Sequence, residues 1–277
     1  MWIMLIVISL GAGVQSSAMF LMACRGELQP KPDVAIFADT KWEPKGVYEW
    51  LDELEVIGAL AGIPVIRATK GDLRADAIRS EVRGRTANGS RWASMPLHTL
   101  SPEGSKGIIR RQCTAEYKLN VIEREERRML GLKRGQRAPR AAVEQWIGIS
   151  ADEAARMKDS RNHWQTLRYP LIYDCEPPMT RRDCKAWLER NGYAVPRRSA
   201  CLGCPFHTDA EWREIKRNPE EWRDVVEFDD AIRECGGMRG KVYLHYSCRP
   251  LSEIDFSSAE DRGQLNWINE CEGMCGV

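Results

Sequence analysis

Short runs of apolar residues alternate along the first half of the chain with stretches of helical periodicity. Residues 2–8 (WIMLIVI) are continuously apolar, as expected of a strand that is buried on both faces. A turn containing Gly11 and Gly13 comes next, and residues 16–24 are helix-like. This part of the sequence therefore predicts a strand, a tight turn and a helix.

The same succession is repeated further along the chain. Residues 34–37 predict a second strand, and a helix over 43–61 follows it. The apolar residues of that helix recur at helical spacing: Val47, Trp50, Leu51, Leu54 and Ile57. Residues 64–68 and 143–149 (VEQWIGI) predict two further strands.

Fully apolar strands alternating with helices predict a Rossmann-like α/β fold, a parallel sheet with helices on both faces, because such strands have no solvent-facing side. We expect this domain over residues 1–174 and a mainly helical, cysteine-rich extension over 175–277. The remaining predicted elements are a mobile loop or lid over 83–107 and helices over 115–130, 180–191, 209–216 and 219–232.

Composition favours a soluble protein of the cytoplasm. Hydrophobic residues make up 43% of the chain and charged residues 29%, as in globular proteins. The apolar run near the N-terminus has no preceding Lys or Arg and is too short to cross a membrane, so we expect neither a secretory signal nor a membrane partner. Without a signal, the ten cysteines favour an intracellular protein that uses thiols or metals.

The formal net charge of +1 hides two basic stretches, over residues 133–140 and 181–198. Each is equally compatible with a solvated face and with a site for phosphate or a polynucleotide such as tRNA or DNA.

The turn after the first strand is a candidate phosphate site. Small residues let the backbone approach a phosphate, and the following helix presents unpaired N–H groups. The turn fits neither the dinucleotide pattern GxGxxG nor the Lys-containing P-loop, and a plain strand-to-helix turn capped by serine is the alternative. Its candidate residues are Ser9, Gly11, Gly13, Gln15 and Ser16. Asp39 ends the second strand, and carboxyl ends of parallel strands converge at one sheet edge.

Several cysteines are clustered as metal ligands are. Cys201 and Cys204 form a CxxC pair, Cys271 and Cys275 form a Cx3C pair, and Cys113 follows two arginines. A CxxC pair serves iron–sulfur clusters, zinc sites and redox dithiols alike. His207 and His245 receive no role, because a lone histidine is more often an ordinary hydrogen-bonded residue.

The order of these segments resembles the PP-loop ATP pyrophosphatase and phosphoadenosine phosphosulfate (PAPS) reductase superfamily, the adenine nucleotide alpha hydrolases, in its iron–sulfur form. Residues 39–43 (DTKWE) are similar to that family's DTG-type segment. Residues 110–118 (RRQCTAEYK) resemble its first cysteine motif, with Gln112 where the iron–sulfur members have a second cysteine, and residues 146–150 resemble its next strand. The resemblance implies a HUP-type sheet.

The resemblance also implies roles for individual residues. The first loop (Ser9, Gly11, Gly13, Gln15 and Ser16) and Asp39 would hold ATP, or PAPS or adenosine phosphosulfate (APS), with Mg²⁺ as a further candidate. Cys113, Cys201 and Cys204 would hold a 4Fe-4S cluster, with zinc as the alternative. Cys271 lies in a tail similar to the one that carries the reductases' nucleophile, and we expect Cys275 to be the fourth ligand, with Cys271 and Cys248 as alternatives.

Three functions follow as expectations. The first is iron–sulfur-assisted redox or sulfur-transfer chemistry on an adenine nucleotide, as in PAPS reduction, with a thiol electron donor or a sulfur donor as partner. The second is ATP-dependent sulfur modification of a nucleic acid, as in tRNA thiolation or DNA phosphorothioation. The third, of another class, is a non-catalytic zinc-bound module that binds nucleic acid or has a regulatory role.

Overall fold

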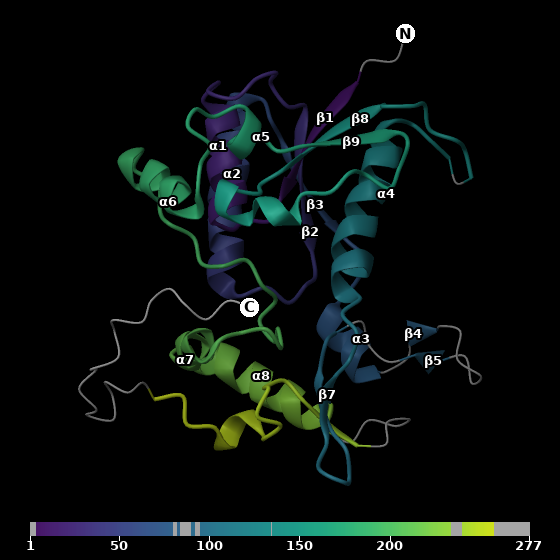
Figure 1. Cartoon of the computed structure of the whole chain (residues 1–277), viewed down its shortest axis with the longest axis vertical. Coiled ribbons are helices and arrows are strands. Elements are labelled where there is room, and N and C mark those ends of the chain that lie inside the picture. Colours follow the sequence, from purple (N-terminus) through teal and green to yellow (C-terminus); the bar gives the residue numbers. More distant parts are fainter. Residues whose placement is uncertain are drawn as a thin grey trace. The chain divides into compact units, whose positions relative to one another are not determined.

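The computed structural model describes residues 4–79, 82–83, 90–91, 95–133, 135–233 and 240–257. The chain forms two compact units (Figure 1). Unit 1 contains residues 1–76 and 111–201, and unit 2 contains residues 77–110 and 202–277. The predicted boundary after residue 174 falls inside unit 1.

Unit 1 is built on a five-stranded sheet whose order is β3-β2-β1-β8-β9, with every neighbouring pair parallel. The strands are β1 (Leu5–Leu10), β2 (Val34–Asp39), β3 (Val65–Thr69), β8 (Val143–Ile147) and β9 (Gln165–Arg168). The chain builds outward from β1 to β3 on one side and then restarts beside β1 with β8. The expected α/β class with a parallel sheet is confirmed.

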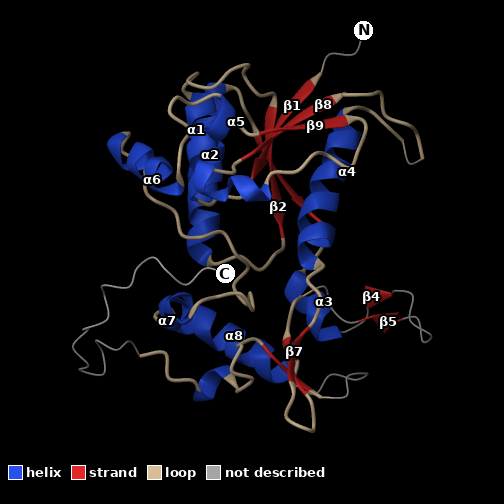
Figure 2. Ribbon diagram, in the orientation of Figure 1, coloured by secondary structure: helices blue, strands red, loops and turns tan. Residues whose placement is uncertain are grey.

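Helices flank both faces of this sheet (Figure 2). On one face, Ile6 and Ile8 of β1 belong to the same core as buried side chains of α1 (Val14–Cys24), α2 (Lys45–Ala61) and α6 (Arg181–Arg190). On the other face, Val7 shares a core with Val121 and Ile122 of α4 (Asn120–Met129). Side chains of a strand alternate between faces, so an unbroken apolar run is what a strand between two helical layers requires.

Further helical turns lie along unit 1. Residues expected in one helix over 115–130 form a π-helix, η1 (Thr114–Leu119), which continues into α4. A 3-10 helix, η2 (Ala151–Arg156), and a short helix, α5 (Pro170–Tyr173), precede α6. In sequence, α3 (Leu73–Arg79) spans the boundary between the two units.

Unit 2 combines antiparallel strands with helices. The sheet has the order β10-β6-β7, from β6 (His98–Leu100), β7 (Lys106–Ile108) and β10 (Lys241–Tyr243). The strands β4 (Val82–Arg83) and β5 (Ser90–Arg91) pair separately. The described part of the expected loop over 83–107 is therefore partly strand.

The helices of unit 2 are α7 (Asp209–Lys216), α8 (Pro219–Ala231) and the 3-10 turn η3 (Leu251–Glu253). Sequence periodicity predicted α6, α7 and α8 to within one or two residues, and the structure confirms them. Within the described residues, no helix has both the length and the apolar character needed to cross a bilayer.

Candidate functional site

The expected ligand-binding edge of unit 1 lies where β1, β2 and β8 end. The chain changes direction of growth between β1 and β8, and open α/β sheets bind ligands outside the carboxyl ends of the strands at such a switch point. The turn after β1 and the segment after β8 meet there, because the two strands are paired from Leu5 with Val143 to Ser9 with Ile147. Ser9 is the expected site residue that lies within β1 itself.

The turn from β1 into α1 is stabilised by the hydroxyl group of Ser16. Oγ of Ser16 accepts hydrogen bonds from the backbone N–H of Gly11 at 3.2 Å and of Gly13 at 3.3 Å. Ala12 between them has a φ of 53°, in the left-handed region. The structure thus brings three expected site residues together at the N-terminus of α1, where helix N–H groups and the helix dipole favour an anion.

Gln15 has a bridging position on α1. Its side-chain amide nitrogen donates to Oγ of Ser150 at 3.4 Å and to Oε2 of Glu153 at 3.2 Å. Its amide oxygen accepts from a guanidinium nitrogen of Arg181 at 3.1 Å. Gln15 therefore joins α1 to the segment after β8 and to the start of α6, and its polar atoms are engaged within the protein.

Gly148, directly after β8, is a site residue that sequence reasoning did not single out. A Cβ atom at this position would lie 2.8 Å from Cα and 2.9 Å from the backbone nitrogen of Ser16. Only glycine allows β8 and the first turn of α1 to approach so closely. The sequence signal that could have revealed this close approach is the position of Gly148 directly after the residues of β8.

The segment before Cys201 packs on the same turn. A Cβ atom at Gly13 would lie 3.3 Å from Cβ and 3.4 Å from the backbone nitrogen of Ser199. Ser199 lies in unit 1, as does Cys201, the last residue of that unit. Cys201 and the candidate phosphate turn therefore lie at the same edge of the unit 1 sheet.

Asp39 is held by its own neighbours at the end of β2. Its Oδ1 accepts from the backbone N–H of Lys41 at 2.7 Å and from the hydroxyl of Tyr48 at 2.9 Å, while Nζ of Lys41 lies 2.9 Å from Oδ2. Burial, reinforced by the hydrogen bond to Asp39, raises the pKa of Tyr48, so this phenol remains a donor. The Asp39 carboxylate thus shapes the turn after β2, in which Lys41 has a φ of 60°.

A buried polar cluster follows Asp39. Oε1 of Glu43 accepts from the hydroxyl of Thr40 at 3.1 Å, and the Cys201 thiol lies 3.6 Å from the same oxygen. Cys201 Sγ is also 3.3 Å from Oγ1 of Thr40, and Nζ of Lys118 lies 3.5 Å from Oε1 of Glu43. We name Thr40, Glu43, Lys118 and Cys201 the thiol cluster.

Glu43 is the least exposed member of the thiol cluster. Its side chain is 0% exposed, and its second oxygen, Oε2, has no hydrogen-bond partner among the described residues. Glu43 is the last residue of the DTKWE segment, and the sequence alone did not indicate a role for it. A buried carboxylate beside a thiol and an ammonium group is a feature of functional sites more often than of packing cores.

Cys113 stands at the start of η1, the π-helix that carries Lys118. π-helical turns are rare and occur frequently at functional sites. Oγ1 of Thr114 is buried and has no hydrogen-bond partner among the described residues. Lys118 of this π-helix contacts Glu43. Cys113 is half-buried and forms no disulfide with a described residue.

The expected metal ligands are not gathered by the described residues. Nowhere in residues 4–257, apart from the undescribed gaps, do three His, Cys, Asp or Glu side chains form a group that could hold a metal ion. Cys204 belongs to unit 2, and Cys271 and Cys275 lie outside the described residues. Cys248 is buried in unit 2, with its thiol 3.6 Å from the carbonyl of Thr99.

Four further cysteines have no paired spacing in the sequence: Cys24, Cys175, Cys184 and Cys235. Cys184 is buried and Cys24 half-buried in the α1–α6 core, and burial raises the pKa of the two thiols to about 12 and about 11. Cys175 is half-buried and packs against the same core. Cys235 lies outside the described residues.

Both histidines without an expected role lie in unit 2 and are hydrogen-bonded. Nε2 of His245 is 3.0 Å from Oδ1 of Asp209, and its Nδ1 is 2.8 Å from Oγ of Ser247. Nε2 of His207 is 3.1 Å from the carbonyl of Leu202. Both rings are buried, as expected of histidines that hold loops in place.

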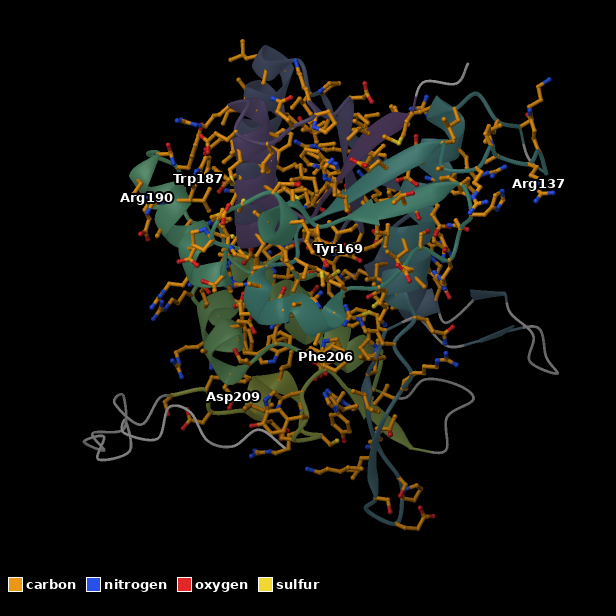
Figure 3. All side chains as sticks on the ribbon, turned by 45° about the horizontal axis from the view of Figure 1, so that its top comes forward. Arg137, Tyr169, Trp187, Arg190, Phe206 and Asp209 are labelled. Atoms are coloured by element: carbon orange, nitrogen blue, oxygen red, sulfur yellow. The ribbon has the colours of Figure 1, made fainter. Side chains whose placement is uncertain are left out.

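The two basic stretches have different surroundings. In the stretch over 181–198, Arg181 is bonded to Gln15 and to Asp152, whereas Arg190 projects from the end of α6, beyond Trp187 (Figure 3). In the stretch over 133–140, Arg137 extends on the loop between α4 and β8 (Figure 3). Arg134 lies outside the described residues.

No protein-family model matches the chain, and a search of curated proteins finds no match.

Proposed function

We propose that this protein is an enzyme that binds an adenine nucleotide at the carboxyl edge of unit 1 and performs redox or sulfur-transfer chemistry, as PAPS reductase-like enzymes do. One observation carries the proposal: Ser199 packs on Gly13 while Cys201 lies within hydrogen-bond distance of Thr40. A phosphate-sized turn and a thiol thereby share one edge of a Rossmann-like sheet.

The phosphate end of the nucleotide would lie at the N-terminus of α1. The backbone of Gly11, Ala12 and Gly13 carries no bulky side chain, so an anion can approach it closely. Ser16 fixes the shape of this turn through its bonds to Gly11 and Gly13. A preformed turn costs little ordering free energy on binding, which favours affinity.

The thiol cluster would supply the chemistry beside the phosphate. Thr40 and Glu43 hold the sulfur of Cys201 in place, and the ammonium group of Lys118 lies against the Glu43 carboxylate. The ammonium group of Lys118 offsets the negative charge of the carboxylate that lies beside the thiol. Thr40, Glu43 and Lys118 are therefore positioning residues for Cys201 in this proposal.

Thiolates are the ligands that both iron–sulfur clusters and zinc accept. Cys113, Cys201 and Cys204, with Cys275 as the fourth ligand, would form that set, and a cluster would supply electrons or an activated sulfur. The described residues do not gather three of these ligands, so we assign no step to a metal. Cys271 is proposed as the tail nucleophile.

Binding of nucleotides tests the first half of the proposal. Isothermal titration of the full chain with ATP, PAPS and APS should show binding of at least one, and Ser16→Ala should weaken it because the turn loses its central acceptor. Ser257→Ala is the matched control, since its hydroxyl contacts only Asp255 among the described residues. If the full chain binds none of the three nucleotides, the proposed site is wrong.

Metal content tests the second half. Anaerobically purified protein should contain iron, acid-labile sulfide and broad absorption near 400 nm, and Cys201→Ser should lower all three. Zinc without sulfide would favour the non-catalytic module. For Cys271→Ser, unchanged cluster content with lost sulfite production would identify the tail as the nucleophile.

A second function is favoured by the basic loop between α4 and β8. Arg137 and Arg140 are exposed and form no ion pair with any described residue, which suits contact with a phosphate backbone. An enzyme that uses ATP to modify tRNA or DNA with sulfur would need such a contact. Retention of the protein on tRNA or DNA, weakened by salt, would support this function.

A further inference from the structure

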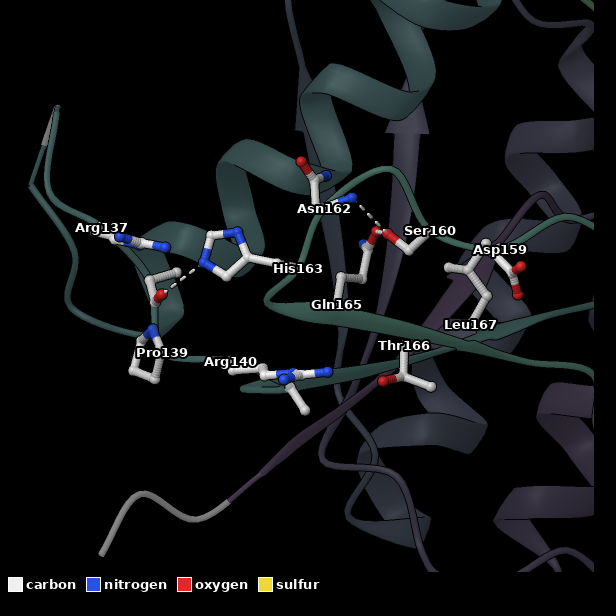
Figure 4. A pocket seen from close by; sticks show the side chains of 12 residues that line it. Arg137, Pro139, Arg140, Asp159, Ser160, Asn162, His163, Gln165, Thr166 and Leu167 are labelled. Carbon is white, nitrogen blue, oxygen red and sulfur yellow. Dashed lines mark hydrogen bonds between the residues drawn. The ribbon is translucent and has the colours of Figure 1, made fainter.

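A pocket of about 840 Å³ lies at the opposite edge of the unit 1 sheet from the thiol cluster. Three segments line it: residues 137–141 before β8, residues 159, 160, 162 and 163 before β9, and residues 165–167 at the start of β9 (Figure 4). Val143 and Gln165 pair at the amino ends of their strands, which places the pocket at the amino edge. The proposed adenine-nucleotide site uses the carboxyl edge, so it does not account for this pocket.

The floor of the pocket is a fixed polar network. Gln165 is 8% exposed, and its amide nitrogen donates to Oε2 of Glu126 at 2.8 Å and to Oε1 of Gln145 at 2.7 Å. Its amide oxygen accepts from the hydroxyl of Ser160 at 2.8 Å. A floor whose hydrogen bonds are all internal keeps its shape when a ligand enters.

The walls of the pocket are also tied together. Nε2 of His163 is 3.2 Å from the carbonyl of Ala138, and the backbone N–H of Ala141 donates to the carbonyl of His163 at 3.2 Å. The backbone N–H of Asn162 donates to Oγ of Ser160 at 3.1 Å. These bonds join the two loops before β8 and β9 into one preformed concave surface.

Charges are separated along the pocket. Figure 4 shows Arg137 at one end and Asp159 at the other, with the polar side chains of Asn162 and Thr166 between them. Arg140 adds a second guanidinium to the lining. Neither arginine forms an ion pair with a described residue, so both guanidinium groups can face a ligand.

This separation selects a class of ligand. Guanidinium groups bind phosphate through paired N–H donors, and a carboxylate recognises the hydroxyl groups of a ribose. A ribonucleotide carries both features in one molecule, and pockets of roughly 300–1,000 Å³ hold ligands of that size. A simple anion would make no use of Asp159, and a polynucleotide lying flat would not fill a pocket.

We propose that this pocket binds a ribonucleoside 5′-phosphate, with Arg137 and Arg140 on the phosphate and Asp159 on the ribose hydroxyls. The source is either a free mononucleotide or the terminal nucleotide of an RNA chain. The inference is independent of the adenine-nucleotide site at the carboxyl edge, and it shares Arg137 and Arg140 with the second function proposed above.

Titration of the full chain with UMP, dUMP and uridine tests the assignment. UMP avoids the adenine preference of the carboxyl-edge site. We expect UMP to bind, uridine to bind at least about tenfold more weakly because it lacks the phosphate, and dUMP to bind more weakly because it lacks the 2′-hydroxyl. Equal affinity for all three, or no binding of UMP, would overturn the proposal.

Variants identify the residues that make these contacts. The double variant Arg137→Gln/Arg140→Gln should lower the affinity for UMP at least about tenfold. Asp159→Asn should reduce the preference for UMP over dUMP. Arg128→Gln is the matched control, because Arg128 is exposed on α4, bonded to Glu125, and outside the lining; a loss of UMP binding equal to that of the double variant would contradict the assignment.

Two further arms separate the sources and the sites. A short oligouridylate that binds more tightly than UMP, with the same dependence on Arg137 and Arg140, identifies an RNA end, and weaker binding identifies the free mononucleotide. Ser16→Ala should weaken ATP binding and leave UMP binding unchanged. Failure at the amino edge and failure at the carboxyl edge are therefore distinguishable.

Discussion

The Cys201 thiol lies 3.6 Å from Oε1 of Glu43, although the two residues are 158 positions apart in the chain. This contact fastens the last residue of unit 1 to the turn that follows β2. It also places a sulfur atom beside a carboxylate that has no access to solvent.

Replacing Glu43 by alanine should loosen the thiol cluster. Glu43→Ala removes the acceptor of Thr40, Lys118 and Cys201 and leaves a cavity, so the free energy of unfolding should fall by about 2–4 kcal/mol. Cys201 should then react faster with a neutral thiol reagent, as followed by mass spectrometry of the modified peptide.

Glu49→Ala is the control for this change. Glu49 lies nearby in the chain, on α2, with a side chain that is 63% exposed and a loose ion pair to Lys45, so its loss should change stability by less than about 0.5 kcal/mol. Similar effects of the two substitutions would show that the thiol cluster contributes nothing specific.

Gly148→Ala should separate β8 from α1. The added methyl group would meet backbone atoms of Ser16 at less than 3 Å, and backbone cannot move aside as a side-chain end can. We expect a loss of about 2–4 kcal/mol in the free energy of unfolding, with weakened ATP binding.

Gly46→Ala provides the opposite expectation within the same unit. A methyl group at Gly46, in the first turn of α2, meets nothing within 4 Å, so the substitution should be neutral or stabilise by about 0.4–1 kcal/mol. Denaturant titration of both variants checks the pair, and a harmless Gly148→Ala would refute the close approach.

Glu126 should make the stability of the protein depend on pH. Burial raises the pKa of Glu126 to about 8, opposed by the hydrogen bond from Gln165. The folded chain therefore binds this proton more tightly than the unfolded chain does. Its stabilising contribution is fully present below about pH 4.5 and is lost as the pH rises through about 8.

Glu126→Gln tests this by removing the titration. The wild type should lose stability between about pH 5 and about pH 8, at up to about 1.4 kcal/mol per pH unit, and the variant should show a flatter profile. The amide can still accept from Gln165, so the network survives. Urea unfolding across this range is the measurement, and parallel profiles for the two proteins would contradict it.

Asp229 should be the most sensitive carboxylate of unit 2. It accepts from the backbone N–H of Leu244 at 2.8 Å and of Leu251 at 3.0 Å, and it pairs with Arg233. Asp229→Ala leaves these donors buried and without an acceptor, which should lower the free energy of unfolding by about 3–5 kcal/mol.

Asp230→Ala separates this effect from a general loss of charge on α8. Asp230 is 61% exposed and lies 3.6 Å from the same arginine, so its removal should cost less than about 1 kcal/mol. Thermal unfolding of both variants is sufficient, and equal shifts would refute the special role of Asp229.

Most of the unit 1 sheet was predictable from the apolar residues of its strands. β1 and β2 are almost wholly apolar, whereas β3 (VIRAT) and β8 (VEQWI) also carry polar residues, and all four strands were expected. β9 (QTLR) was missed, because it is an edge strand with polar residues whose partners are other side chains. Short strands such as β6 and β7 carry too few residues to show a period.

The location of the candidate site at the ends of the strands was predictable, whereas most contacts between its side chains were not. The turn over Gly11 to Ser16 was expected from its small residues and is closed on Ser16. The contact of Glu43 with Cys201 was not expected, because it depends on where the chain returns after 158 residues. Asp39 and Gln15 are engaged by neighbours that a linear pattern does not reveal.

The chain leaves unit 1 after residue 76, returns at residue 111 and leaves again after residue 201. Unit 2 is consequently assembled from two segments, and β6 finds its sheet partner β10 only with residues 241–243. During synthesis on the ribosome, every residue of unit 1 emerges before that partner does. Vectorial folding would therefore complete the five-stranded sheet of unit 1 first, while the hairpin of β6 and β7 lacks its partner strand until the rest of unit 2 is translated.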